Sequence, residues 1–163
     1  MNPHTAFIAL GSNLEAPVTQ IHQALVKLGK MPKTKLTARS SLYRSAPLGN
    51  INQPQFINAV AKLETKLAPR ELLRSLLDIE LRHGRRREYP NAPRTLDLDL
   101  LLYDDLIYHE HGLTIPHPRM HQRAFVLLPL HEIAPDSVVP GIGSVAELLA
   151  ACSGQDVQRL VED

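Results

Sequence analysis

Three stretches of the chain have the apolar patterns of strands, one as a continuous run and two as an alternation of apolar and polar residues with a period of two. Residues 5–10 form a short apolar run that ends at Gly11-Ser12-Asn13, and residues 36–43 alternate loosely. The clearest alternation covers residues 55–65. One face of this stretch carries Ile57, Ala59, Ala61 and Leu63, and the other carries Phe56, Asn58, Val60 and Lys62. The pattern predicts three strands.

Two of these strands carry polar residues that allow two interpretations. An amide beside an aromatic ring, as at Asn58 and Phe56, suits a flat heterocycle that forms hydrogen bonds. The same pattern is also typical of a half-exposed strand face. Gly11-Ser12-Asn13 is either a turn that approaches a ligand or an ordinary turn from strand to helix. The residues alone leave these alternatives open.

Helical spacing of apolar residues follows two prolines that suit a first helical turn. The first helix is expected from Pro17 to Gly29, and the second from Pro69 to about Gly84. Their apolar faces consist of Val18, Ile21, Ala24, Leu25 and Leu28 in the first, and of Leu72, Leu73, Leu76, Leu77 and Ile79 in the second.

The C-terminal part of the chain contains shorter segments. Asp104-Asp105 marks a turn, and another short strand is expected to begin at 106–108. Residues 125–133 are apolar with helical spacing, interrupted by Pro129. A terminal helix is expected at 145–151, with a short final element at 157–161.

The most informative stretch is Pro93 to Tyr103. Read as a strand, it places Leu96, Leu98, Leu100 and Leu102 on one face, and Thr95, Asp97, Asp99 and Leu101 on the other. The Cα atoms of the two aspartates then lie about 7 Å apart, at ~3.3 Å per residue. Two carboxylates this close repel each other unless a cation lies between them, and Mg²⁺ prefers such oxygen ligands. A solvated strand face is the alternative.

Five arginines lie from Arg82 to Arg94, and Glu88 is the only acid among them. This run has neither helical nor strand periodicity, which favours a loop that delivers guanidinium groups to an anion. A solvated basic loop or a nucleic-acid patch is the alternative. Guanidinium groups match phosphate oxygens, and the neighbouring carboxylates would repel nucleic-acid phosphate. We therefore favour a small polyphosphate substrate.

Several other polar residues are candidates for ligand or metal binding. His117 stands between two prolines that fix the backbone, and Arg119, His121 and Arg123 follow it closely. Glu80 is read as a solvated charge or as an acid that faces a ligand. His109 and His111 lack a third metal ligand, which favours a surface pair.

Composition limits the classes of protein and the cellular compartments that are compatible with this chain. The chain has 163 residues, a net charge of +1 and one cysteine, Cys152, so it contains no internal disulfide and a reducing, cytoplasmic setting is expected. Near-neutral charge argues against nucleic acid as an obligate partner. No segment is apolar enough to span a membrane, and no Gly-x-x-x-x-Gly-Lys loop is present. One domain covering residues 1–163, acting as a monomer, is expected.

Taken together, these motifs resemble the 6-hydroxymethyl-7,8-dihydropterin pyrophosphokinases of folate biosynthesis. The strongest match is Ala92-Pro93-Arg94-Thr95-Leu96-Asp97-Leu98-Asp99-Leu100-Leu101. Supporting matches are Phe7 to Leu14, Pro47-Leu48-Gly49, Gln53 to Asn58, Glu80 to Arg87 and Pro116 to Met120. The family transfers the terminal pyrophosphoryl unit of ATP to the pterin hydroxymethyl group and releases AMP.

The resemblance implies a role for each matching residue. Asp97 and Asp99 would hold two Mg²⁺ ions and, with Arg85 and Arg94, form the catalytic set. The ATP-binding residues would be Glu80, Arg87, Arg94, Leu100, Leu113, Thr114, His117, Pro118 and Arg123. The pterin-binding residues would be Ser45, Ala46, Leu48, Phe56, Asn58 and Phe125.

The same resemblance implies an α+β fold, a ferredoxin-like α/β sandwich with a mostly antiparallel sheet and helices packed on its faces. Two rival functions remain from the residues: an RNA-binding module of the same fold, which would use Phe56, Phe125 and the arginine loop, and an ATP-dependent transferase that acts on another alcohol. Mg²⁺-dependent ATP binding would distinguish the pyrophosphokinase from the RNA-binding module. Pterin binding would distinguish it from a transferase that acts on another alcohol.

Overall fold

The computed structural model describes residues 3–13, 16–45, 55–83, 96–110 and 112–161. Its main sheet has the strand order β10-β3-β4-β1-β5, with β2 also paired to β4, and every pairing is antiparallel. These strands are β1 (His4–Ser12), β2 (Thr34–Arg39), β3 (Tyr43–Ser45), β4 (Phe56–Thr65), β5 (Asp97–Tyr103) and β10 (Val157–Arg159). The expected antiparallel sheet is confirmed.

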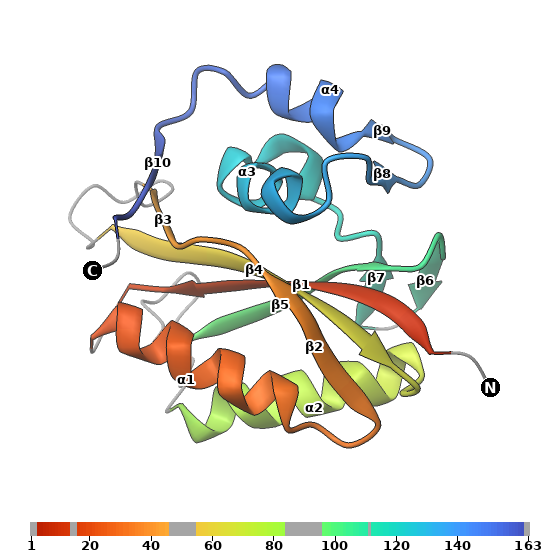
Figure 1. Cartoon of the computed structure of the whole chain (residues 1–163). Coiled ribbons are helices and arrows are strands. Elements are labelled where there is room, and N and C mark those ends of the chain that lie inside the picture. Colours follow the sequence, from red (N-terminus) through yellow and green to blue (C-terminus); the bar gives the residue numbers. More distant parts are fainter. Residues whose placement is uncertain (1–2, 14–15, 46–54, 84–95, 111, 162–163) are drawn as a thin grey trace.

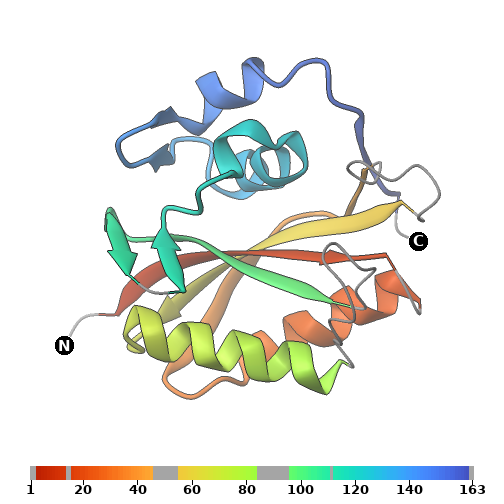
Figure 2. The ribbon, with the colours of Figure 1, turned by 180° about the vertical axis from the view of Figure 1, so that it is seen from behind.

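Two layers of helices cover the sheet (Figures 1 and 2). One face packs against α1 (Pro17–Gly29) and α2 (Pro69–Arg82), and the opposite face packs against α3 (Ala124–Ile133), with α4 (Val145–Ala150) beyond it. The remaining elements are a 3₁₀ helix η1 (Met120–Gln122) and two hairpins, β6 (Tyr108–Glu110) with β7 (Leu113–Ile115) and β8 (Val138–Val139) with β9 (Gly143–Ser144). The expected α/β sandwich is therefore confirmed.

Alternation along the strands produces two apolar clusters, one on each face of the sheet. The cluster beneath α1 and α2 includes Ile8, Leu10, Leu63, Leu98 and Leu100 together with the apolar faces of both helices. The cluster beneath α3 includes Phe7, Val60, Leu101, Met120 and Leu127. Because both faces are covered, β4 is buried on both sides from Ile57 to Ala61, and the interpretation of its second face as half-exposed is wrong at Asn58 and Val60.

Several expectations need correction. The stretch at 36–43 is two strands, β2 and β3, rather than one. Leu102 packs under α3, not with Leu98 and Leu100, because the register between β1 and β5 shifts between Phe7 and Ile8. Such a bulge moves the following side chains to the other face.

Other boundaries also differ from the sequence pattern. On α2, Leu77 is exposed whereas Glu80 is buried, so the interpretation of Glu80 as a solvated charge is wrong. The strand expected from residue 106 begins at Tyr108. Helix α3 accommodates Pro129 in its interior.

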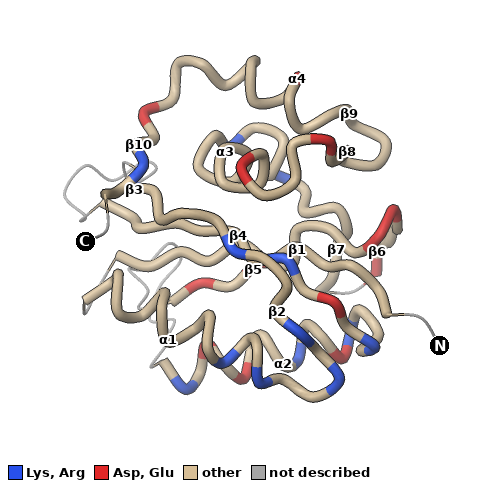
Figure 3. Tube along the Cα trace, viewed as in Figure 1, with Lys and Arg blue, Asp and Glu red and all other residues tan. Residues whose placement is uncertain are grey.

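Acidic and basic residues intermix along α2, whereas the charged residue of α1 is Lys27 (Figure 3). Of the helices in the described ranges, none combines the length and apolar character needed to cross a bilayer.

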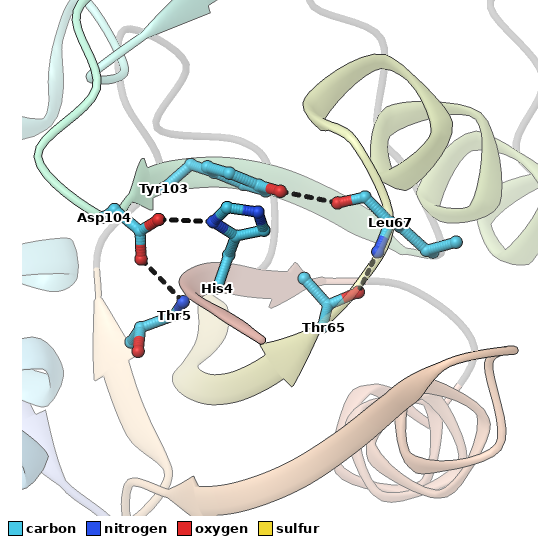
Figure 4. Close-up of polar contacts among 6 residues, drawn as sticks. All are labelled: His4, Thr5, Thr65, Leu67, Tyr103 and Asp104. Carbon is cyan, nitrogen blue, oxygen red and sulfur yellow. Dashed lines mark hydrogen bonds and ion pairs between the residues drawn. The ribbon is translucent and has the colours of Figure 1, made fainter. Parts of the chain in front are cut away.

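At the C-terminal end of β5, polar groups are engaged with one another (Figure 4). The Asp104 carboxylate accepts hydrogen bonds from His4 Nδ1 at 2.6 Å and from the Thr5 backbone N–H at 2.8 Å. The Tyr103 hydroxyl donates to the Leu67 carbonyl oxygen at 2.6 Å, and its ring lies 4.9 Å from the His4 ring. The polar groups at this end of the strand thus form hydrogen bonds with other residues of the chain; it is called the closed end below.

Candidate active site

At the other end of β5, small residues of β1 separate two groups of polar side chains. Asp97 lies opposite Gly11, which lies opposite Asn58 on β4, and Asp99 lies opposite Ala9. Directly opposed residues of antiparallel strands share a face, and this is the α3 face of the sheet. Since neighbouring strands are about 4.8 Å apart, β4 and β5 are separated by roughly 10 Å. The small β1 residues leave this span open for a ligand.

Gly11 helps to leave this span open, but from within a strand rather than from the turn that the sequence indicated. It lies inside β1, so the expected turn at Gly11 is wrong by position. A Cβ atom added there would contact Asn58 Oδ1 at 3.5 Å and Phe56 Cδ1 at 3.9 Å. The glycine keeps free the surface between the amide and the acidic strand.

The amide of Asn58 is fixed by a neighbouring strand. Its Nδ2 donates to Ser45 Oγ at 2.6 Å, and both side chains are buried. Ser45 pairs with Phe56 in the register of β3 and β4, so the three residues adjoin. Asn58 retains an acceptor oxygen on the Gly11 side, which suits the edge of a heterocycle with adjacent donors.

A buried acid on α2 bonds to the backbone of the strand that carries the aspartate pair. Glu80, on the last turn of α2, is 1% exposed, and its Oε2 accepts the Leu98 backbone N–H at 2.6 Å. Leu98 lies between Asp97 and Asp99, whose side chains are half-buried on the opposite face. Glu80 thus fixes the backbone of the acidic strand.

His117 approaches the acidic strand from the segment after β7. Its backbone N–H donates to the Leu101 carbonyl at 3.0 Å, and its Nδ1 accepts the Arg119 N–H at 3.2 Å. Burial is the largest factor that lowers the pKa of His117 to about 4, and Arg123 and Arg119 lower it further while Asp97 opposes them. The ring is therefore neutral at pH 7, and with Nδ1 as acceptor it carries its proton on Nε2.

Arg123 connects the acidic strand to an aromatic ring. Burial lowers its pKa, Arg119 adds to this effect, and the carboxylates of Asp99 and Asp97 oppose it. The guanidinium carbon lies 5.5 Å from the centroid of the Phe125 ring, a cation–π arrangement. The N-terminal end of α3 thus brings a cation and a stacking surface together.

A pocket of about 840 Å³ lies along β5 beside the β6–β7 hairpin. Its volume falls within the usual range for ligand sites. Its lining includes Asp99 and, among the expected nucleotide-binding residues, Leu100, Leu113, Thr114, His117 and Pro118. The structure therefore brings residues from three separate segments into one pocket.

The expected residues Ala46, Leu48, Arg85, Arg87 and Arg94 lie outside the described residues, as does His111. Within the described ranges, no group of three or more His, Cys, Asp or Glu side chains is arranged to hold a metal ion. A metal at Asp97 and Asp99 would therefore need further ligands from substrate or water, as Mg²⁺ commonly does.

Two carboxylates on a rigid strand, cationic side chains beside them and an adjoining pocket are typical of enzymes that transfer phosphoryl groups. Residues 7–135 match the 7,8-dihydro-6-hydroxymethylpterin-pyrophosphokinase family. The chain belongs to this family, and the resemblance stated from the sequence is confirmed.

Individual relatives cover nearly the whole chain. A 2-amino-4-hydroxy-6-hydroxymethyldihydropteridine pyrophosphokinase from Pseudomonas aeruginosa is 48% identical over 154 residues, 94% of this chain and 95% of the relative. The enzyme of the same name from Haemophilus influenzae is 50% identical over 145 residues, 89% of this chain and 91% of the relative.

Solved structures agree on the fold. An HPPK-DHPS protein crystallised in complex with substrates superposes on 93% of this chain with a TM-score of 0.73 and 13% identity. This chain spans 43% of that longer protein. At this identity the likeness establishes the fold alone.

Proposed function

We propose that this chain transfers the terminal pyrophosphoryl group of ATP to the hydroxymethyl group of 6-hydroxymethyl-7,8-dihydropterin, a step of folate biosynthesis. The observation that carries the proposal is the arrangement across β4, β1 and β5. A half-buried carboxylate pair lies on β5, between the pocket along that strand and the Asn58 amide about 10 Å away on β4. Family membership supports the same reaction.

The acidic pair is suited to two Mg²⁺ ions. Asp97 and Asp99 offer carboxylate oxygens on one strand face, opposite residues no larger than alanine, which leaves room for hydrated cations and phosphate. When bound, Mg²⁺ would neutralise charge on the triphosphate. The two aspartates would hold the cations, and Glu80 would keep the aspartates in place through Leu98.

The pocket along β5 would hold ATP. Leu100, Leu113, Thr114 and Pro118 would enclose the adenine and ribose, and His117 and Arg123 would contact phosphate oxygens. A neutral His117 would donate its Nε2–H, and the anion would offset the repulsion between Arg119 and Arg123. By the resemblance, Arg85, Arg87 and Arg94 would add guanidinium contacts.

The pterin would lie over Gly11. Asn58 would pair with its amide-like edge, while Phe56 and Phe125 would stack on its faces. Ser45, with Ala46 and Leu48, would complete the pocket. Because Arg123 contacts Phe125, the two subsites adjoin at the start of α3.

The reaction would be an in-line attack. The pterin hydroxyl oxygen would form a bond to the β-phosphorus, the bond between that phosphorus and the α-phosphate oxygen would break, and AMP would leave with the electron pair. The hydroxyl proton would pass to solvent. The chain would contribute position and charge complementarity, in which Arg94 and Arg85 would be catalytic.

The test is to incubate the protein with ATP, Mg²⁺ and 6-hydroxymethyl-7,8-dihydropterin and to separate the nucleotide products. We expect AMP only when the pterin is present, and none when a chelator removes the divalent cation. Formation of ADP would mean ordinary phosphoryl transfer. AMP formed equally without pterin, or with another alcohol in its place, would reject the proposed acceptor.

A further inference from the structure

A carboxylate on α3 is bonded to the segment that leads into β3. Glu132 Oε1 accepts the Tyr43 hydroxyl at 2.6 Å and the Ser41 backbone N–H at 3.0 Å, and Oε2 accepts the Ser41 hydroxyl at 2.8 Å. Glu132 itself is exposed, whereas Tyr43 is 4% exposed. Glu132 therefore accepts hydrogen bonds from the first residue of β3, Tyr43, and from Ser41 just before this strand.

These hydrogen bonds keep Glu132 ionised. Burial opposes ionisation, but the hydrogen bonds from Tyr43 and Ser41 hold the pKa of Glu132 below its ordinary value, and Arg159 acts in the same direction. Burial and the bond to Glu132 raise the pKa of Tyr43, so its hydroxyl remains a donor. The contact thus joins a carboxylate to three donor groups at neutral pH.

The strand tied in this way is short and carries the partner of Asn58. β3 has three residues, in which Tyr43 pairs with Asn58 and Ser45 pairs with Phe56. The Ser45 hydroxyl accepts the Asn58 side-chain N–H. A shift of β3 would therefore change the direction of the Asn58 amide.

The other side of the contact is anchored independently. Helix α3 buries Ala124, Val126, Leu127 and Leu130 in the apolar cluster above the sheet. Its first residue also donates its backbone N–H to Gln155 Oε1 at 2.9 Å. When the Glu132 contact is lost, β3 is expected to move more than α3, because the short strand has less apolar anchoring.

We propose that Glu132 is a positioning residue for pterin recognition: through Ser41 and Tyr43 it fixes β3, and through Ser45 it sets the direction of the Asn58 amide. It touches neither the expected nucleotide pocket nor the aspartate pair. The inference rests on the proposed function and assigns this role to a residue outside the substrate contacts.

The test compares Glu132→Ala, Glu132→Gln and Glu147→Ala. Alanine removes both acceptor oxygens, whereas glutamine keeps one and can donate to the Ser41 hydroxyl. Glu147 is exposed on α4, and its side chain forms no hydrogen bond or ion pair with the described residues, so it is a matched control.

We expect Glu132→Ala to raise the KM for the pterin about fivefold and to leave the KM for ATP within about twofold. Glu132→Gln should give a smaller rise, and Glu147→Ala should give none. Tyr43→Phe removes one donor and should resemble the glutamine variant. The glutamine and phenylalanine variants keep the test decisive if the alanine variant does not fold.

An equal rise in both KM values, a fall in kcat alone or no change in any folded variant would overturn the positioning role. A merely structural role would lower the melting temperature without separating the two KM values. Failure of the unaltered protein to form AMP from ATP and the pterin would instead reject the proposed function, and with it this inference.

Discussion

The two ends of β5 both carry acidic residues, but their surroundings are opposite. At one end, Asp104 is engaged by His4 and the Thr5 backbone, and Tyr103 reaches the Leu67 carbonyl (Figure 4). At the other end, Asp97 and Asp99 face His117 and Arg123, whose pKa values are lowered chiefly by burial and further by Arg119. The first end satisfies its polar groups within the chain.

The second end buries basic side chains near one another at a cost in stability. Arg119 lowers the pKa of both His117 and Arg123, although burial is the largest cause for each residue and Asp97 opposes both shifts. A polyphosphate would favour the charged form of these basic side chains. One strand therefore separates a stabilising cluster from a cluster whose electrostatics favour an anionic ligand.

The largest effect on activity should come from replacing the Asp97 carboxylate by the isosteric amide of asparagine. We expect Asp97→Asn to lower kcat about 10³-fold, because a fixed charge at the reacting phosphates is lost. The free energy of unfolding from urea titration should change by less than about 0.5 kcal/mol.

Asp104→Asn is the control at the opposite end of the strand. It should keep kcat within about twofold and lose up to about 1 kcal/mol of unfolding free energy, as expected for a partly exposed pair. Unfolding of Asp97→Asn with unchanged activity per folded molecule would contradict the assignment of the metal ligands.

A smaller effect is expected from one cation of the basic group. Arg123→Met should raise the KM for ATP by roughly 10- to 100-fold, the value of charge-assisted hydrogen bonds. Its melting temperature should not fall, because removal of a crowded charge relieves repulsion. Arg74→Met, at an exposed position of α2, is the control and should leave both values unchanged. A large loss of stability without loss of ATP affinity would show that Arg123 is structural.

The lowered pKa of His117 makes the stability of the Asp97 end depend on pH. Its pKa of about 4 lies below the unfolded value of about 6.5. Between these values the unfolded chain binds more protons, so the contribution of neutral His117 is fully present above pH 6.5 and is lost as the pH falls toward 4.

NMR titration of the metal-free and nucleotide-free protein should place the His117 midpoint near pH 4. In urea unfolding, His117→Gln should reduce the decline in stability between pH 6.5 and 4. A midpoint near 6.5 would mean that burial and the neighbouring arginines do not act on the ring as described.

The smallest effect should follow removal of one hydroxyl at the closed end. Tyr103→Phe should lower the unfolding free energy by about 1 kcal/mol, because the Leu67 carbonyl loses its donor. The KM values and kcat should stay within about twofold. A marked fall in kcat would show that the two ends are coupled through β5.

Sequence patterns predicted most elements of this fold, because apolar periodicity is set by burial. The alternation at 55–65 and the helical spacing of α1 correspond to β4 and α1. The division of 36–43 into two strands and the shift of Leu102 were not predicted. Both depend on pairing with β4 or β1, which the local sequence does not contain.

The candidate site was predictable in part for a similar reason. Asp97 and Asp99 share a face because a strand has a period of two, and the structure confirms that placement. The contacts of Gly11, Glu80 and Glu132 arise only when distant segments meet; the sequence named Gly11 and Glu80 as candidates without their partners and did not indicate Glu132. An acid two or three residues from the end of a helix gives no indication of its partner on another element.

The bond between Glu80 and Leu98 also affects how the molecule behaves toward its own copies. β5 is the edge of the main sheet, and exposed edge amides and carbonyls offer a template for strand addition and aggregation. Glu80 occupies one edge amide, and the His117 backbone occupies the Leu101 carbonyl. Two contacts at the candidate site thus also shield β5 from intermolecular β-sheet growth.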